Sequence, residues 1–240
     1  MPLSRTEVNE HMASDAVRSF GCAVIPGVFS RDQIAQLIPL ADEAVRSSSA
    51  RAGARIGVGA GLVERVLAHE PYAEVIGSLG AYKPVRVIVF DKSADQNWAV
   101  AWHRDTSIAV QARHEAEGFG PWSIKDGVHH VQPPPSVLRD MVTARLHLDP
   151  TPASNGALQV IPGSHLDIGE DWPSVDRGRM DREPITLEAD AGDVVLMNPL
   201  MLHASSKSTH QSAQPTHRRV VHIEFARSLL PEPLEWFADQ

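Results

Sequence analysis

Several features are scarce in this 240-residue chain, and each scarcity excludes a class of protein. The only cysteine is Cys22, so no internal disulfide can form, which suits a reducing compartment such as the cytoplasm. No stretch approaches the ~18 consecutive apolar residues that a membrane-spanning helix needs. The opening segment MPLSRTEVNEHM also lacks the apolar core of a secretory signal. We therefore expect a cytoplasmic protein without a membrane span.

Basic residues are also few. Lys and Arg total 22 against 30 Asp and Glu, which gives a net charge of -8. An acidic chain of this kind is a poor partner for nucleic acid or an anionic membrane surface. A small-molecule substrate is the expected partner, and the sequence gives no indication of the oligomeric state.

The composition is that of one globular domain over residues 1–240. Hydrophobic residues make up 42% of the chain, enough for a sizeable core, and 18 prolines with 16 glycines predict many turns. Residues of about 1–80 are mainly helical in pattern: Ser30 is a candidate N-cap, with Ile34 and Leu37 at helical spacing behind it. From about 84 to 230, short β-branched runs separated by turns predict a sandwich or barrel. Within this second range, residues of about 107–139 form a polar, proline-rich connection that we expect to be a lid-like loop, with His129 and His130 in solvent.

A histidine and an aspartate stand two residues apart in WAVAWHRDTSIAV. On an extended strand, His103 and Asp105 would lie on the same face, where they could occupy two neighbouring positions on a divalent metal. A surface turn is the alternative, and the pair alone does not decide between them.

A distal histidine and an arginine strengthen the metal interpretation. His203 follows the apolar run GDVVLMNPLML, and Arg218 opens the strand-like segment RRVVHIEFA. Two histidines and one carboxylate make the facial triad of non-haem Fe(II) oxygenases. A guanidinium group binds a carboxylate through two hydrogen bonds, as a cosubstrate with a free carboxylate requires.

These segments, together with AVRSFGCAVIPGVFSRDQIAQL and LHLDPTPASNGALQVIPGSH, resemble the phytanoyl-CoA dioxygenase family of Fe(II)/2-oxoglutarate oxygenases over most of the chain. The resemblance implies a double-stranded β-helix, a jelly-roll or cupin-like barrel, with flanking N-terminal helices. It also implies Fe(II), 2-oxoglutarate and O2 as reactants, and oxidation of an unactivated C–H bond with release of succinate and CO2. By the same resemblance, His103, Asp105 and His203 are the iron ligands.

The cosubstrate clamp has two candidates. The family's spacing from arginine to aromatic residue, here Arg218 to Phe225, selects Arg218. Arg219, however, shares strand parity with the apolar residues Val221 and Ile223, and a bulge would be needed to reconcile the two arguments. We prefer Arg218.

Other residues have secondary roles in this interpretation. The candidate cosubstrate contacts besides Arg218 are Arg145, Ser205 and Asn97, and the candidate substrate contacts are Trp98, Trp122 and Lys125. Arg145 is notable because it interrupts the apolar segment VTARLHL, where an unpaired charge is costly; a structural ion pair with Asp149 or Glu224 is the alternative.

Hydroxylation is the expected reaction because Asp105 is intact: in related halogenases a small residue replaces this carboxylate. Two other functions remain open at this point. One is a barrel that binds metal and 2-oxoglutarate without turnover, as a sensor or binding module. The other is a cupin-like Zn or Mn enzyme of another reaction class.

Overall fold

The computed structural model describes residues 10–48, 50, 53–80, 82–93, 96–169, 172–174, 181–209 and 217–237. The helices are α1 (Glu10–Phe20), α2 (Arg31–Arg46), α3 (Gly61–Leu67), α4 (Glu70–Leu79) and α5 (Pro135–Arg139). The strands are β1 (Cys22–Ile25), β2 (Ala54–Ile56), β3 (Lys83–Lys92), β4 (Val100–His103), β5 (Ile108–Val110), β6 (Trp122–Lys125), β7 (Val128–Val131), β8 (Met141–His147), β9 (Leu158–Val160), β10 (Ile185–Leu187), β11 (Val194–Met197), β12 (His203–Ser205) and β13 (Arg218–Ala226). Short 3-10 turns lie at Ala153–Asn155 and Ser164–Leu166.

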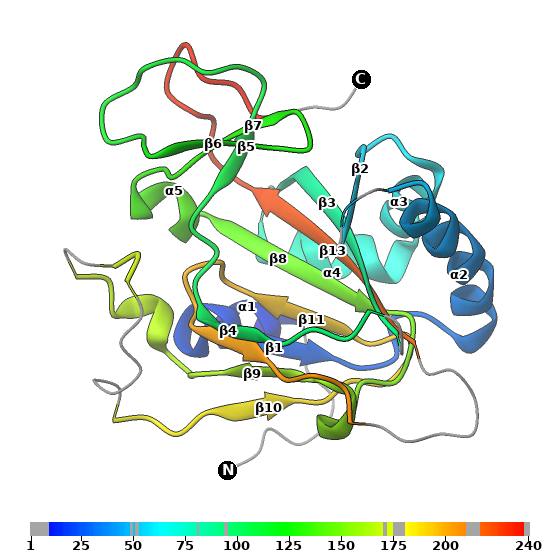
Figure 1. Cartoon of the computed structure of the whole chain (residues 1–240). Helices are drawn as coiled ribbons and strands as arrows, with labels where there is room; N and C mark the ends of the chain where they lie inside the picture. The colour runs from blue at the N-terminus through cyan, green and yellow to red at the C-terminus, as the bar shows by residue number, and fades with distance from the viewer. Residues whose placement is uncertain are drawn as a thin grey trace.

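The described chain is mainly β, and its strands pair antiparallel in three sheets (Figure 1). A six-stranded sheet has the order β1-β11-β8-β13-β3-β2, and a four-stranded sheet has the order β10-β9-β12-β4. Strands far apart in the sequence are neighbours in both sheets: β3 pairs with β13, and β4 pairs with β12. Residues near 100 and 205 are therefore neighbours in the smaller sheet, and residues near 145 and 220 are neighbours in the larger one.

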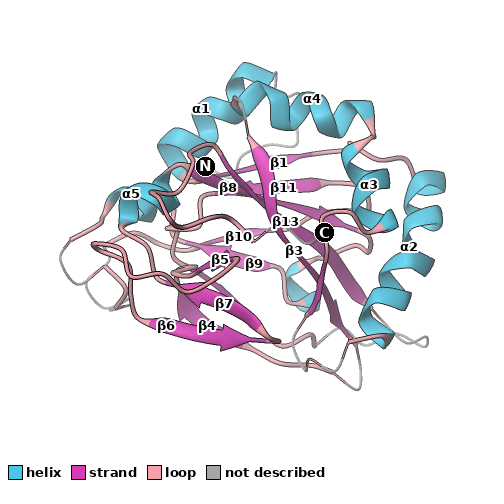
Figure 2. Cartoon of the chain, turned by 90° about the horizontal axis from the view of Figure 1, so that it is seen from above, coloured by secondary structure: helices cyan, strands magenta, loops and turns pink. Residues whose placement is uncertain are grey.

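The N-terminal helices cover one face of the six-stranded sheet, and the four-stranded sheet lies on its other side (Figure 2). The alternation of β13 explains this arrangement. Val221, Ile223 and Phe225 are buried in the core cluster that includes residues of α1 to α4. The intervening residues of β13 therefore face the four-stranded sheet, because successive strand residues point to opposite faces.

Helix α2 begins as the sequence predicts. The Ser30 side chain accepts a hydrogen bond from the Gln33 backbone N–H, and the Gln33 side chain accepts one from the Ser30 N–H, which completes a capping box. Ile34, Leu37 and Ala41 form its buried face. The part of the chain predicted to be mainly helical contains α1 to α4 together with the short strands β1 and β2; residues 1–9 lie outside the described residues.

The expectation of a lid-like loop over residues of about 107–139 is wrong. This segment contains the three-stranded sheet β5-β7-β6 and helix α5. Ile108 of β5 pairs with Val131 of β7, and both are fully buried in a core cluster of their own. Short apolar stretches among the polar residues supply this second core, so the segment is an ordered part of the fold. His130, expected in solvent, is fully buried in β7.

None of the helices in the described part of the chain is both long and apolar enough to span a bilayer.

Candidate metal centre

His103 and His203 face each other across two neighbouring strands. They are direct partners in the antiparallel pair of β4 and β12, and their ring centroids are 4.1 Å apart. The Nδ1 atoms of His103 and His203 lie 2.8 and 2.9 Å from the carbonyl oxygens of Ala101 and Met201. Each Nδ1 therefore carries the proton and donates, which leaves the Nε2 lone pair of each ring free to bind a metal.

Asp105 completes the set. It lies just after the end of β4, where its backbone N–H donates to the Pro199 carbonyl at 2.9 Å. Its two carboxylate oxygens are each 3.9 Å from one of the two imidazole Nε2 atoms. Burial alone would raise the pKa of Asp105, but electrostatic interactions with His203, His222, His103 and Arg86 lower it to about 2. Asp105 is therefore ionised at neutral pH.

The donor set fits a divalent transition metal. One ligand atom from each of His103, Asp105 and His203 can be chosen so that all three lie within 4.8 Å of one another. Asp105 Oδ2 is buried and has no hydrogen-bond partner among the described residues. Burial lowers the pKa of His203 to about 4, so its imidazole is neutral and available at pH 7. Two neutral imidazoles and one carboxylate on the same side leave the remaining metal positions open.

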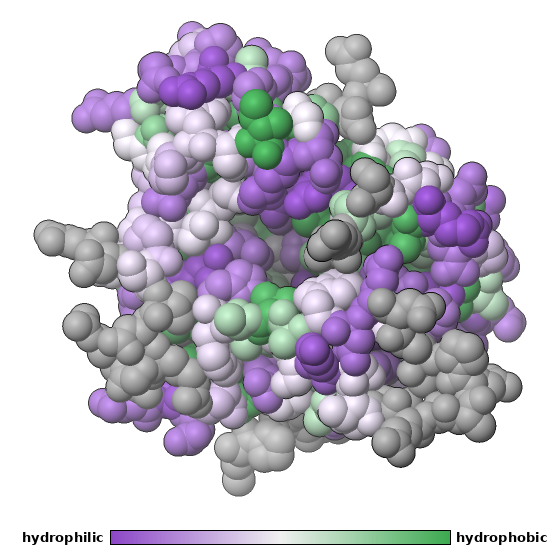
Figure 3. All heavy atoms as spheres, in the orientation of Figure 1, coloured by the Kyte–Doolittle hydropathy of each residue, from purple (hydrophilic) through white to green (hydrophobic). Residues whose placement is uncertain are grey.

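A cavity of about 190 Å³ adjoins these three side chains, between the two larger sheets. One wall comes from the six-stranded sheet and includes Phe90, Arg145, Arg218 and His222. The opposite wall comes from the four-stranded sheet and includes Val100, Leu158, Ala204 and Ser205. In the space-filling view, the face toward the reader is hollowed near its middle, below the three-stranded sheet (Figure 3).

Three cations surround the cavity. Arg145 and Arg218 line it, and Lys92 donates to Ser205 Oγ at 2.7 Å and to the Ser206 carbonyl at 2.8 Å. All three side chains are buried, and none has an ion-pair partner in the part of the chain that the structure describes. Burial, followed by repulsion from Arg218 and Arg145, lowers the pKa of Lys92 to about 7. Unpaired buried cations are costly, so this wall is suited to an anionic ligand.

The side chains of Arg218 and Arg219 lie on opposite faces of the six-stranded sheet. Arg218 is buried and donates to the carbonyl of Gly156. Gly156 has a φ of +66°, and a Cβ there would lie 2.6 Å from the Ser206 carbonyl oxygen, so a glycine is needed at this close approach. Arg219 instead makes ion pairs with Asp149 and with Asp42 of α2. The strand register is regular from Arg218 to Glu224, and its shift lies between Glu224 and Phe225, so no bulge intervenes near Arg218.

The other candidate residues divide into two groups. Ser205, Arg145 and Trp98 line the cavity. Arg145 bonds to neither of the expected partners Asp149 and Glu224; its Nη1 donates to His222 Nδ1 at 2.9 Å.

Asn97, Trp122 and Lys125 are not in the cavity lining. Asn97 binds the backbone of Ser208 through both side-chain atoms, at 2.8 Å each. Trp122 packs against the core of the three-stranded sheet, and Lys125 donates to Ser107 Oγ at 3.1 Å.

Sequence reasoning missed Lys92, His222 and Phe90. The signal for His222 was its parity: it stands four residues after Arg218 on an alternating strand, and therefore on the same face. Lys92 gave a weaker signal, as a charged residue that directly follows the segment VRVIVFD.

The chain is similar to a known protein family and to several solved structures. The sequence profile of the phytanoyl-CoA dioxygenase (PhyH) family matches residues 17–216. No curated protein matches the chain. Among solved structures, AviO1 from Streptomyces viridochromogenes Tue57 has a TM-score of 0.66 at 21% identity, over 94% of this chain and 98% of that one. The non-haem α-ketoglutarate-dependent epimerase SnoN of nogalamycin biosynthesis has a TM-score of 0.62 at 18% identity, over 90% and 81%. HygX from Streptomyces hygroscopicus, solved with nickel and 2-oxoglutarate, has a TM-score of 0.59 at 13% identity, over 92% and 88%. At these identities the likeness shows a shared fold.

Proposed function

The chain belongs to the phytanoyl-CoA dioxygenase family, and we propose that it is an Fe(II)- and 2-oxoglutarate-dependent dioxygenase. Its reaction would oxidise an unactivated C–H bond of a small organic substrate, by hydroxylation, with release of succinate and CO2. We also infer that its two larger sheets form the double-stranded β-helix of this enzyme class. The observation that carries the proposal is a two-histidine, one-carboxylate set beside a cavity with three cations that have no ion-pair partner among the described residues.

In this proposal, His103, Asp105 and His203 hold Fe(II), which supplies the oxidising chemistry with O2. The carbonyls of Ala101 and Met201 fix both imidazole rings through their Nδ1 protons, so that the Nε2 atoms stay aimed at one point. Asp105 provides the negative charge that the two neutral imidazoles do not.

Arg218 binds the carboxylate of 2-oxoglutarate that is remote from the metal. Arg218 lines the cavity at the first position of β13, and its guanidinium group donates to the Gly156 carbonyl. Lys92 donates to the Ser205 hydroxyl of the opposite wall and adds a second positive charge. Arg145 adds a third, and His222 fixes its position. A dianion is thus bound by groups that are already buried and need little reorganisation.

The test is conversion of 2-oxoglutarate to succinate by the full chain, with Fe(II) and O2, in wild type and in Asp105→Ala. The proposal expects iron-dependent succinate from wild type only. A barrel that binds without turnover would give no succinate above the protein-free background. Calorimetric binding of 2-oxoglutarate in the same samples separates that outcome from a site that does not bind it at all.

A further inference from the structure

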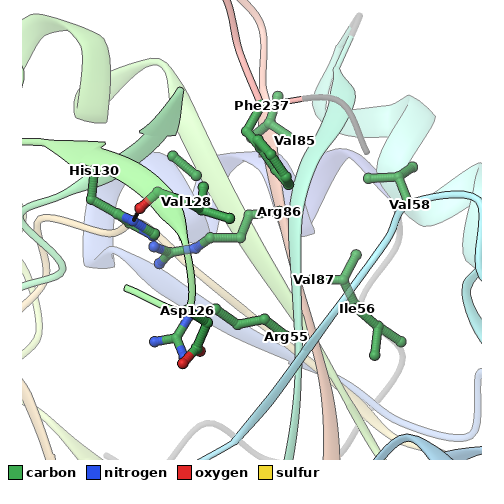
Figure 4. A pocket seen from close by; sticks show the side chains of 11 residues that line it. Arg55, Ile56, Val58, Val85, Arg86, Val87, Asp126, Val128, His130 and Phe237 are labelled. Atoms are coloured by element: carbon green, nitrogen blue, oxygen red, sulfur yellow. Dashed lines mark hydrogen bonds and ion pairs between the residues drawn. The ribbon is translucent and has the colours of Figure 1, made fainter. Parts of the chain in front are cut away.

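A second cavity, of about 260 Å³, lies beside the three-stranded sheet (Figure 4). Its walls come from β2, β3, the β6–β7 hairpin and Phe237 near the end of the chain. Most of the lining is aliphatic, with Val58, Val85, Val87 and Val128 among it. Such a cavity suits a small apolar body.

One chain of buried polar contacts joins this cavity to the metal centre. Arg86, which lines the second cavity, makes an ion pair with Glu224. Glu224 Oε1 accepts from His222 Nε2 at 3.3 Å, and His222 Nδ1 accepts from Arg145 at 2.9 Å. His222 and Arg145 both line the metal cavity, and the charge of Arg86 also reaches Asp105, whose pKa it helps to lower. The second cavity is therefore a neighbour of the reacting centre.

The permanent charges at the second cavity are already paired. Arg86 is neutralised by Glu224, and Arg55 by Asp126. This differs from the metal cavity, where three cations have no carboxylate partner among the described residues. An anionic ligand would have to compete with two existing ion pairs, so the second cavity favours a neutral ligand.

Three polar atoms of the residues that line the second cavity lack a hydrogen-bond partner among the described residues: the donors Arg86 Nε and Arg55 Nε, and His130 Nε2. His130 is fully buried, and its Nδ1 donates to the Val128 carbonyl at 3.0 Å, so Nε2 is an acceptor. Burial lowers the pKa of His130 to about 4, which keeps the ring neutral at pH 7. In the described part of the chain neither His130 Nε2 nor the donor Arg86 Nε has a hydrogen-bond partner. Figure 4 shows the His130 ring pointing toward the Arg86 guanidinium.

A hydroxyl group satisfies His130 Nε2 and Arg86 Nε at once, because it donates one hydrogen bond and accepts others. We propose that the second cavity binds the primary substrate, and that this substrate is a small neutral molecule with an apolar body and a hydroxyl group held between His130 and Arg86. The hydroxyl donates to His130 Nε2 and accepts from Arg86 Nε. That the bound molecule is a substrate rests on the proposed function, whereas its chemical class is inferred from the cavity alone.

The same argument disfavours two other ligand classes. A free carboxylic acid would place its negative charge against the lone pair of His130 Nε2. A coenzyme A thioester would bring several phosphate charges to a cavity whose arginines are already paired, and its bulk exceeds what about 260 Å³ can enclose.

The experiment compares three six-membered-ring probes: cyclohexanol, methoxycyclohexane and cyclohexanecarboxylate. Their dissociation constants are measured by ligand-observed NMR on the full chain with Zn²⁺ and 2-oxoglutarate, so that no turnover occurs. We expect cyclohexanol to bind about five- to tenfold more tightly than methoxycyclohexane, the effect of one hydrogen-bond donor. Cyclohexanecarboxylate should bind most weakly.

Variants locate the effect. His130→Phe should bring the first two dissociation constants within about twofold of each other, because the acceptor is gone. His129→Phe is the matched control: it alters the neighbouring residue of β7, which points to the opposite face, and should keep the preference. Val58→Trp should fill the cavity and abolish cyclohexanol binding while leaving the affinity for 2-oxoglutarate unchanged.

Tightest binding by cyclohexanecarboxylate overturns the inference. So does a preference for cyclohexanol that survives in His130→Phe, binding that survives in Val58→Trp, or no cyclohexanol binding at its solubility limit. These outcomes are independent of the proposed function, whose own failure is the absence of succinate when Zn²⁺ is replaced by Fe(II).

Discussion

Arg218 and Arg219 are adjacent on β13 and point to opposite faces of the six-stranded sheet. Arg218 enters the cavity beside the metal centre, and Arg219 makes ion pairs with Asp149 and Asp42 on the helix side. The apolar residues that share parity with Arg219 are Val221, Ile223 and Phe225, and they pack against the helices. Alternate residues of β13 therefore face either the apolar layer under the helices or the polar wall of the cavity.

This relationship predicts opposite effects for two neighbouring substitutions. Arg218→Ala should raise the KM for 2-oxoglutarate by about a hundredfold or more, because a buried carboxylate would lose its charged partner. Arg219→Ala should leave this KM within about twofold but lower the free energy of unfolding by about 1–3 kcal/mol, since Asp149 and Asp42 lose their partner. Steady-state kinetics and urea unfolding of both variants check the pair. A large KM increase in Arg219→Ala alone would mean that the wrong arginine was chosen.

Lys92 predicts a pH dependence of cosubstrate binding. Its pKa is lowered to about 7, so the side chain is protonated below this pH and loses its charge above it. A dianion binds the protonated form better, and the affinity for 2-oxoglutarate should therefore weaken as the pH rises above about 7. Calorimetric titrations with 2-oxoglutarate at several values between about pH 6 and pH 9 measure this trend. The Lys92→Met variant should bind 2-oxoglutarate more weakly than wild type at low pH, and its affinity should not change with pH. If its affinity falls with pH as steeply as that of wild type, Lys92 is not the group responsible.

Asp105→Ala should remove iron-dependent turnover and weaken metal binding by at least about tenfold. The substitution deletes the anionic ligand and leaves two neutral imidazoles. Metal content after dialysis and succinate formation with excess Fe(II) are the two readouts, and Asp32→Ala, at an exposed position in the first turn of α2, is the control. Turnover near the wild-type value in Asp105→Ala contradicts its role as a ligand.

Ile108→Ala should lower the free energy of unfolding by about 2–4 kcal/mol, because it empties a fully buried position opposite Val131. Ile124→Ala, in the same three-stranded sheet but 66% exposed, should change it by less than about 0.5 kcal/mol. Hydrogen exchange adds a second measurement: β5 and β7 should be protected. Rapid exchange throughout both strands would instead restore the interpretation of this segment as a mobile lid.

The sequence predicted elements whose pattern is local. The Ser30 cap, the α2 stripe and the long strands β3, β8 and β13 follow from residue types at fixed spacing. His103, Asp105 and His203 were also predicted from sequence, because few residue types bind transition metals and the distal histidine follows an apolar strand. The structure brings one ligand atom of each within 4.8 Å of the others.

What sequence reasoning could not supply depends on contacts between distant segments. The core of residues 107–139 forms only when β5 and β7 pair, and each strand alone is too short to carry a periodic signal. Lys92 acquires its role because β3 ends beside Ser205 of β12, more than a hundred residues later in the chain. The parity argument for Arg219 was misleading for a similar reason: which face of a strand is apolar does not reveal whether helices or the second sheet cover that face.

The most direct measurement is a crystal structure of the protein prepared without oxygen, with Fe(II) and 2-oxoglutarate. The account predicts one iron ion at ~2.0–2.3 Å from the Nε2 atoms of His103 and His203 and from a carboxylate oxygen of Asp105. It also predicts that the remote carboxylate of 2-oxoglutarate contacts Arg218 within the cavity that Ser205 lines. An ion bound elsewhere, or a cosubstrate carboxylate held by Arg219 outside the cavity, would contradict it.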